Sequence, residues 1–260
     1  MDRTIPTSFY LKETYFSSLC NHLDDALNDP FIAPKGTYFL IALNHHYGDN
    51  LRVLLKYKPS DGFSEETWSN IANIAMKKIQ NNHYNPIFSD DGIFLNPPQG
   101  TVLYNSFVPF DYQNSPISSL LWDFQWNLHS ILRIVVDYNE DWSPILVSLI
   151  SRIQRHLLDN LHKFSPLLRE TLIEELKRYF YGNALKTCNC NKFQFEFDAN
   201  IETILSSINC LFSESMQFLS QQGTFPLRQY YNVISALTNS QFGIENKHRM
   251  LVVESILKTL

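Results

Sequence analysis

The chain has 260 residues, of which 44% are hydrophobic and 18% charged, so it can bury a full core and is too apolar for a disordered protein. Its formal charge of −5 gives no overall attraction for nucleic acid or for an anionic membrane surface. No run approaches the roughly 18 apolar residues of a membrane span, and the N-terminal segment lacks the apolar core of a secretion signal. The four cysteines are too few for a disulfide scaffold. We therefore expect a cytoplasmic protein.

The first part of the chain is predicted to be rich in β-structure. Residues 5–10 favour an edge strand, and residues 11–27 favour a helix because large apolar side chains recur at four-residue steps. Two apolar runs, Tyr38–Leu43 and Leu51–Tyr57, then flank the polar segment Asn44–Asn50, which ends in Gly-Asp-Asn. Such a link is typical of a turn, so the sequence predicts a β-hairpin.

A helix and an irregular segment follow the hairpin. Ser64 is a good N-cap for a helix that runs to about Asn82. Residues 85–112 contain short apolar runs broken by Gly and Pro, which indicates a loop or a hairpin that ends in a strand over Val102–Phe110. The order strand, strand, helix favours an α+β layer over a helical bundle.

The rest of the chain is predicted to be largely helical. Ser-Pro pairs at 143–144 and 165–166 are typical of helix starts, and the alternation in Lys192–Phe197 favours an edge strand. We expect helices over 115–136, 143–164, 166–181, 201–220, 226–237 and 247–260. The predicted fold class is therefore α+β: a β-rich N-terminal layer with a hairpin and flanking helices, over 1–112, followed by a helical C-terminal half, over 113–260.

The hairpin link brings several reactive side chains together. It contains His45, His46 and Asp49, and Arg52 follows on the second strand. Adjacent residues of a strand point to opposite faces, so the two histidines cannot easily share a metal ion. The two thiols of Cys188–Cys190 lack further ligands at zinc spacing. No phosphate loop or dinucleotide fingerprint occurs, and we expect neither a metal nor another cofactor.

Two helical segments carry basic side chains. His129 and Arg133 are four residues apart and share a helix face, which suits either an anion site or an ordinary solvated face. The segment Ser151–Lys163 has a basic stripe with leucines between its cations. Most such helices are simply amphipathic, but a basic stripe beside a groove would suit an acidic peptide.

The order of these motifs resembles a known family. The segment Tyr38–Tyr57 is similar to the part of the small elimination domain of lantibiotic dehydratases and thiopeptide biosynthesis proteins that reads roughly FFIRY, a polar turn, then HLRLR. Residues 118–158 resemble the helical middle of that domain. Asn239–Ile244, followed by a helix with Glu254, resembles its closing NRLFGI element. The resemblance implies that residues 1–260 form a single domain of this kind.

The departures from the family pattern bear on the reaction. Arg52 matches the arginine of the HLR element. Glutamate elimination needs a base for the α-proton and cations for the enolate, and the family positions of these groups carry other residues here. Leu43 or Ala42 replaces the first arginine, Asn50 the histidine, Leu54 the second arginine, and Ile234 or Ser235 the catalytic histidine. A chain of this kind that lacks the eliminating groups resembles the thiopeptide pyridine synthases.

That resemblance implies a substrate and a reaction. The substrate is a dehydrated, azole-containing precursor peptide with its leader, and two of its dehydroalanines join in a formal aza-Diels-Alder reaction. Loss of water and of the leader peptide then gives a pyridine, without a metal or a redox cofactor. Nucleic acid and membranes are not expected partners, whereas a homodimer or a contact with other biosynthetic enzymes stays open.

We expect the catalytic groups at the hairpin, in the LYNSF segment and on the helix that lacks the histidine. These candidates are His45, His46, Asp49, Arg52, Tyr104, Ser106, Tyr230 and Tyr231. The candidates for binding substrate or leader are Arg152, Arg155, His156, Lys163, His129 and Arg133. Three other interpretations stay open: a glutamate-eliminating subunit of a split dehydratase, a noncatalytic peptide-binding scaffold, and an unrelated α+β protein.

Overall fold

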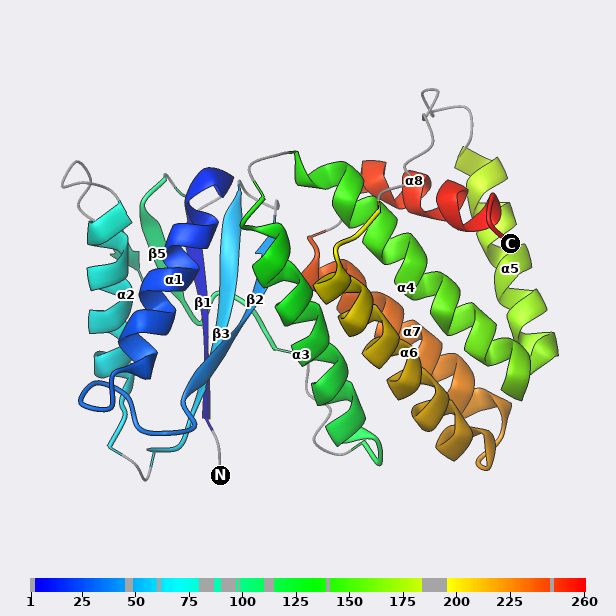
Figure 1. Ribbon diagram of the computed structural model, residues 1–260, viewed down its shortest axis with the longest axis horizontal. Coiled ribbons are helices and arrows are strands. Elements are labelled where there is room, and N and C mark those ends of the chain that lie inside the picture. Colours follow the sequence, from blue (N-terminus) through cyan, green and yellow to red (C-terminus); the bar gives the residue numbers. More distant parts are fainter. Residues whose placement is uncertain are drawn as a thin grey trace. The chain divides into compact units, whose positions relative to one another are not determined.

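The computed structural model of the chain divides into two compact units, Met1–Asp111 and Tyr112–Leu260 (Figure 1). Among the described residues, the first unit contains the strands and the second is helical, so the predicted α+β class is confirmed. The expectation that both units belong to one domain stays a prediction. The structure describes residues 3–44, 49–59, 62–79, 87–89, 97, 99–109, 115–138, 141–183, 196–243 and 246–260.

Within its described residues, the first unit is built on a five-stranded sheet with the order β2-β3-β1-β5-β4. Strands β2 and β3 pair antiparallel, with Asn44 opposite Asn50 at the turn end, so the predicted hairpin is confirmed. Strand β4 runs parallel to β5, whereas the other pairs are antiparallel. The strands are β1 (Arg3–Tyr10), β2 (Tyr38–Asn44), β3 (Asn50–Tyr57), β4 (Ile87–Ser89) and β5 (Thr101–Tyr104).

Strand β1 lies inside the sheet, between β3 and β5, and the expected edge position is wrong. Pro6 would be unusual inside a sheet because it has no N–H for the ladder. Here β5 pairs only with Thr7–Phe9 of β1, whereas β3 pairs with all of it. Pro6 therefore lies beyond the end of β5, where β1 has one neighbouring strand.

Strand β5 is shorter than the sequence pattern indicates. β5 was expected to reach Phe110 but ends at Tyr104. Asn105 has a φ of 51°, and this left-handed conformation ends the extended chain. Because β4 is parallel to β5, the two do not form the hairpin considered for residues 85–112.

The described part of the first unit also contains the helices α1 (Phe16–Asn28) and α2 (Glu65–Ile79), which pack against each other. The helix expected from residue 11 begins as a short 3-10 turn, η1 (Glu13–Tyr15), before α1. The predicted N-cap of α2 is confirmed, since Ser64 Oγ accepts the N–H of Thr67 at 3.1 Å.

Trp68 joins α2 to the sheet. Its indole Nε1 donates to Thr7 Oγ1 on β1 at 2.9 Å, and its ring meets Phe9 edge-on with the centroids 6.3 Å apart. All three side chains are fully buried. Thr7 and Phe9 both lie on the sheet face that α2 covers, and this fixes the orientation of every other side chain in the sheet.

The second unit contains the six helices that were predicted, with shifted ends. Helix α4 packs against α5, α6, α7 and α8, so it is the centre of this unit (Figure 1). Its start was predicted at the Ser-Pro pair 143–144, but α4 begins at Trp142, and the Asp141 carboxylate caps it by accepting the Ser143 N–H. The helices are α3 (Ser118–Val135), α4 (Trp142–Phe164), α5 (Pro166–Asn183), α6 (Ala199–Ser220), α7 (Thr224–Gln241) and α8 (Asn246–Leu257).

The helix α6 begins with a carboxylate cap. Asp198 Oδ1 accepts the N–H groups of Asn200 and Ile201, both at 2.9 Å. The strand predicted over Lys192–Phe197 falls largely outside the described residues, and its last two residues are not in a strand. No helix in the described part of the chain is long and apolar enough to cross a membrane.

Candidate functional site

The register of the strand pairs in the sheet decides which candidate residues share a face. Arg52 lies opposite Ser8 of β1, so both side chains leave the sheet on the same side. Ser8 Oγ is 2.7 Å from Ser106 Oγ, and the Arg52 guanidinium lies 5.1 Å from the ring centroid of Phe107. We call Ser8, Arg52, Ser106 and Phe107 the sheet cluster. It brings together two candidates, Arg52 and Ser106, that are distant in the sequence.

The guanidinium of Arg52 is half-buried in this cluster. Burial lowers its pKa and the interaction with Tyr10 opposes that change, but an arginine keeps its charge at physiological pH. Its Nε is buried and has no hydrogen-bond partner among the described residues. The sheet cluster thus presents a permanent cation on an aromatic ring, which can bind a carbonyl oxygen or an anion.

Tyr104 lies on the opposite face of the sheet from Arg52. It is paired with Thr7, and its hydroxyl donates to Ser69 Oγ of α2 at 3.2 Å. The structure therefore does not place Tyr104 in the sheet cluster. Asp49 is exposed just before β3. The candidates His45 and His46 lie outside the described residues.

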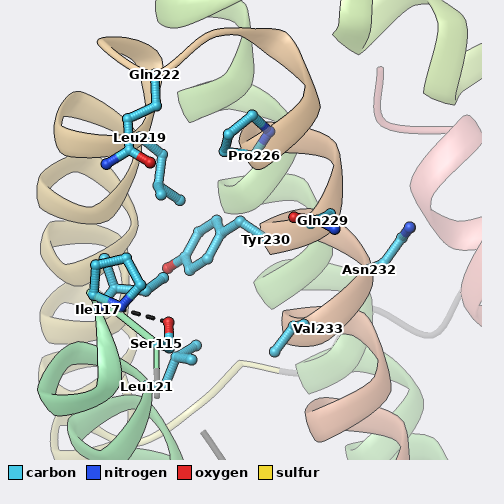
Figure 2. Close-up of a pocket in the computed structure, with 11 residues that line it drawn as sticks. Ser115, Ile117, Leu121, Leu219, Gln222, Pro226, Gln229, Tyr230, Asn232 and Val233 are labelled. Atoms are coloured by element: carbon cyan, nitrogen blue, oxygen red, sulfur yellow. Dashed lines mark hydrogen bonds between the residues drawn. The ribbon is translucent and has the colours of Figure 1, made fainter. Parts of the chain in front are cut away.

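The second unit contains a cavity of about 520 Å³ between the start of α3, the end of α6 and the start of α7 (Figure 2). Four buried residues form what we call its floor, and three exposed amides form its rim. Ser115, Pro116, Pro226 and Val233 complete the lining. The floor residues are Ile117, Leu121, Leu219 and Tyr230, and the rim residues are Gln222, Gln229 and Asn232.

Tyr230 is the predicted catalytic residue that lines this cavity. Figure 2 shows its ring projecting from α7 toward the start of α3, with the hydroxyl directed to the side of Ile117. The side chain is 4% exposed, and burial raises the pKa of the phenol well above its ordinary value, although Ser215 opposes part of the rise. The phenol is therefore protonated at neutral pH and acts as a hydrogen-bond donor.

Tyr231 does not line the cavity. Successive helical residues point about 100° apart, so Tyr231 projects from α7 in a different direction from Tyr230, and it is not among the lining residues. Burial raises the pKa of Tyr231, and Ser235 opposes that rise. The Ser235 hydroxyl donates to Gln154 Oε1 of α4 at 3.1 Å, so this side of α7 faces the middle of the helical unit.

The basic residues of α4 differ in their surroundings. Arg152 is bound by both oxygens of Glu202 on α6, and its guanidinium lies 5.9 Å from the ring centroid of Phe197. Burial lowers the pKa of the half-buried His156, which favours its neutral form. Lys163 is exposed, and Arg155 is half-buried. A role of these residues in binding a leader stays a prediction.

His129 and Arg133 lie on α3. His129 is 8% exposed, its ring centroid is 5.1 Å from that of Trp126, and burial lowers its pKa to about 4. Burial also lowers the pKa of Arg133, and Asp137 opposes this. At neutral pH the pair therefore carries one positive charge, because the imidazole is neutral.

Most of the positions that correspond to eliminating groups of the resembling family are buried. Ile234 is fully buried on α7, and the alternative position, Ser235, is bonded to Gln154. On the sheet, Leu54 and Asn50 are buried as well. Among the described residues, no group of three His, Cys, Asp or Glu side chains could hold a metal ion.

No protein-family model and no curated protein matches the chain. Among solved structures, it is similar to the pyridine synthase TbtD from thiomuracin biosynthesis. The identity is 11% and the TM-score is 0.48, over 99% of this chain and 96% of that chain. A likeness of this size does not define the activity of the chain.

Sequence reasoning missed most of the cavity lining. Pro226, Gln229, Tyr230 and Val233 recur at three- and four-residue steps, and this shared helix face was a usable signal. The other walls come from the starts or ends of α3 and α6, which are distant in the sequence, and no local sequence pattern predicts that they meet α7. Ser8 was missed because its nearness to Arg52 depends on strand pairing.

Proposed function

We propose that the chain is a thiopeptide pyridine synthase. Its substrate is a dehydrated, azole-containing precursor peptide that carries a leader, as the resemblance of the hairpin and of the closing element implies. The observation that carries the proposal is the protonated phenol of Tyr230 in a cavity whose described lining is uncharged. This phenol lies on α7, the helix in which the histidine of eliminating members is replaced.

The proposed reaction has three stages. A dehydroalanine and the neighbouring amide tautomerise to a 2-azadiene, which forms two bonds to a second dehydroalanine and closes a six-membered ring. The ring then loses water, as hydroxide leaving with a proton. In the last stage the bond to the leader breaks, the leader departs as an amide, and the ring becomes an aromatic pyridine.

The phenol of Tyr230 suits the proton transfers of these stages. Tautomerisation places negative charge on an amide oxygen, which a neutral donor stabilises, and loss of water requires protonation of a departing hydroxyl group. Removal of a positioned proton donor typically lowers a rate by a factor of about 10² to 10⁴. Because the cavity is weakly polar, the hydrogen bond to the phenol is stronger there than in water.

Orientation of the peptide supplies the other contribution. Two alkenes that are remote in a long peptide must meet, and holding reactants in place can lower a barrier by about 7 to 11 kcal/mol. The sheet cluster offers the Arg52 guanidinium to a backbone carbonyl of the peptide. We assign the leader to the α4 residues Arg155 and Lys163, because Arg152 is already paired with Glu202.

A glutamate-eliminating reaction is supported less well. It needs a base near the α-carbon, and both candidate positions for the family histidine are occupied by side chains without that capacity, a buried isoleucine and a hydrogen-bonded serine. The sheet retains one arginine of the family pattern, Arg52.

Mass spectrometry of a dehydrated, leader-bearing peptide separates the candidate functions. We expect the mass of the macrocycle after loss of water and of the leader, together with pyridine absorbance. Loss of glutamate from a glutamylated peptide would instead identify an eliminating subunit. An unchanged peptide that still binds would identify a scaffold protein and overturn the proposal.

A further inference from the structure

The cavity of the helical unit has an uncharged lining throughout its described part. Its floor consists of three aliphatic side chains and the protonated phenol of Tyr230, and its rim consists of amides. Arg228, the cation of α7 that lies between lining residues in the sequence, does not line the cavity. Its guanidinium donates to Glu175 of α5 at 2.7 Å.

An uncharged lining has a consequence for what can bind. An ionised group that enters a weakly polar cavity loses its hydration, and the loss is costly unless a counter-charge replaces it. For a neutral apolar group the same transfer lowers the free energy, because its surface leaves water. The lining therefore favours neutral occupants over charged ones of equal size and shape.

The rim indicates what the occupant presents to solvent. Gln229 and Asn232 are three residues apart on α7, and Gln222 lies in the turn that follows α6, on the other wall (Figure 2). A side-chain amide both donates and accepts hydrogen bonds, so it complements the N–H and C=O groups of a peptide. An apolar group flanked by amides would bind to both the floor and the rim.

We propose that this cavity selects its occupant by charge: it binds an uncharged apolar group flanked by peptide amides and rejects an ionised one. The inference rests on the proposed function in that the occupant is a segment of the peptide substrate. Gln229 is then a residue that determines specificity, since it lies at the rim on the same face of α7 as Tyr230.

Two probes of nearly equal size test the charge selection on the full chain at pH 7. N-acetylphenylalanine amide is neutral, whereas N-acetylphenylalanine carries a carboxylate. Binding is measured by NMR through the methyl groups of Ile117, Leu121, Leu219 and Val233, which line the cavity. We expect the neutral probe to shift these methyl signals and to bind at least tenfold more tightly than the carboxylate.

A charge introduced at the rim should change this preference. In Gln229→Arg, we expect the carboxylate to gain about tenfold in affinity while the neutral probe changes less than threefold. Gln221→Arg is the matched control, since Gln221 is exposed at the end of α6 and does not line the cavity. It should leave the selectivity unchanged, and both variants should keep the unfolding temperature of the parent chain.

Equal affinity for the two probes, no binding of the neutral probe, or shifts confined to methyl groups outside the cavity would overturn the inference. The experiment does not measure cyclisation, so its failure is distinct from a failure of the proposed function. A chain that selects by charge but forms no pyridine retains the cavity inference and loses the function. A chain that forms pyridine but binds both probes equally retains the proposed function and loses the cavity inference.

Discussion

Ser8 Oγ and Ser106 Oγ lie 2.7 Å apart, although 98 positions separate the two residues in the sequence. The contact fixes the segment after β5 against β1, on the same sheet face as Arg52. Because Phe107 follows directly and packs against the Arg52 guanidinium, one hydrogen bond between two hydroxyls helps to hold the whole sheet cluster.

Replacing Arg52 by Ala tests whether this cluster takes part in the reaction. We expect kcat/KM for the leader-bearing peptide to fall by at least tenfold, because the cation that binds a substrate carbonyl is lost. The control is Lys56→Ala, which removes another cation of β3 from the same face, where it lies 5.7 Å from the ring centroid of Tyr38. If both variants turn over peptide like the parent chain, the hairpin is a scaffold.

The bond between Trp68 and Thr7 should stabilise the first unit. A double-mutant cycle with Trp68→Phe and Thr7→Val, followed by denaturant unfolding, isolates the interaction. We expect a coupling of about 1 kcal/mol, since both partners are fully buried and each single change leaves the other group unpaired. Additive effects of the two substitutions would show that the bond contributes nothing beyond packing.

His129 should make the stability depend on pH below neutrality. Burial lowers its pKa from an ordinary 6.5 to about 4, so between these values the unfolded chain binds the proton and the folded chain does not. Acidification from pH 6.5 to 4 therefore removes stability, by about 3 kcal/mol from this residue. His129→Gln should flatten the difference in unfolding free energy across that range. A pH profile parallel to that of the parent chain would contradict the assignment.

The hairpin, α2 and the six helices of the second unit could be predicted because their signals are local: alternation, three- and four-residue spacing, and caps. The position of β1 could not, since Pro6 favours an edge and only the short length of β5 makes it tolerable inside the sheet. The separation of Tyr104 from Arg52 depends on register, because a shift of one residue reverses every side chain.

The candidate site could be predicted only in part, because it depends on contacts between segments that are distant in the sequence. Tyr230 was selected because it lies on the helix that lacks the family histidine, without any indication that it would be buried. Its role depends on Ile117 and Leu219, which reach the same cavity from α3 and α6. Helix packing decides which of two adjacent tyrosines faces a cavity, so Tyr230 and Tyr231 could not be distinguished from the sequence.

Turnover of the dehydrated, leader-bearing peptide by Tyr230→Phe tests the central claim most directly. The substitution removes the hydroxyl and keeps the ring, so we expect an unchanged fold, unchanged leader binding and a fall in pyridine formation of about 10² or more. Tyr179→Phe, which removes an exposed phenol of α5, is the control and should have parental activity. Pyridine formation by Tyr230→Phe at the parental rate would contradict the account.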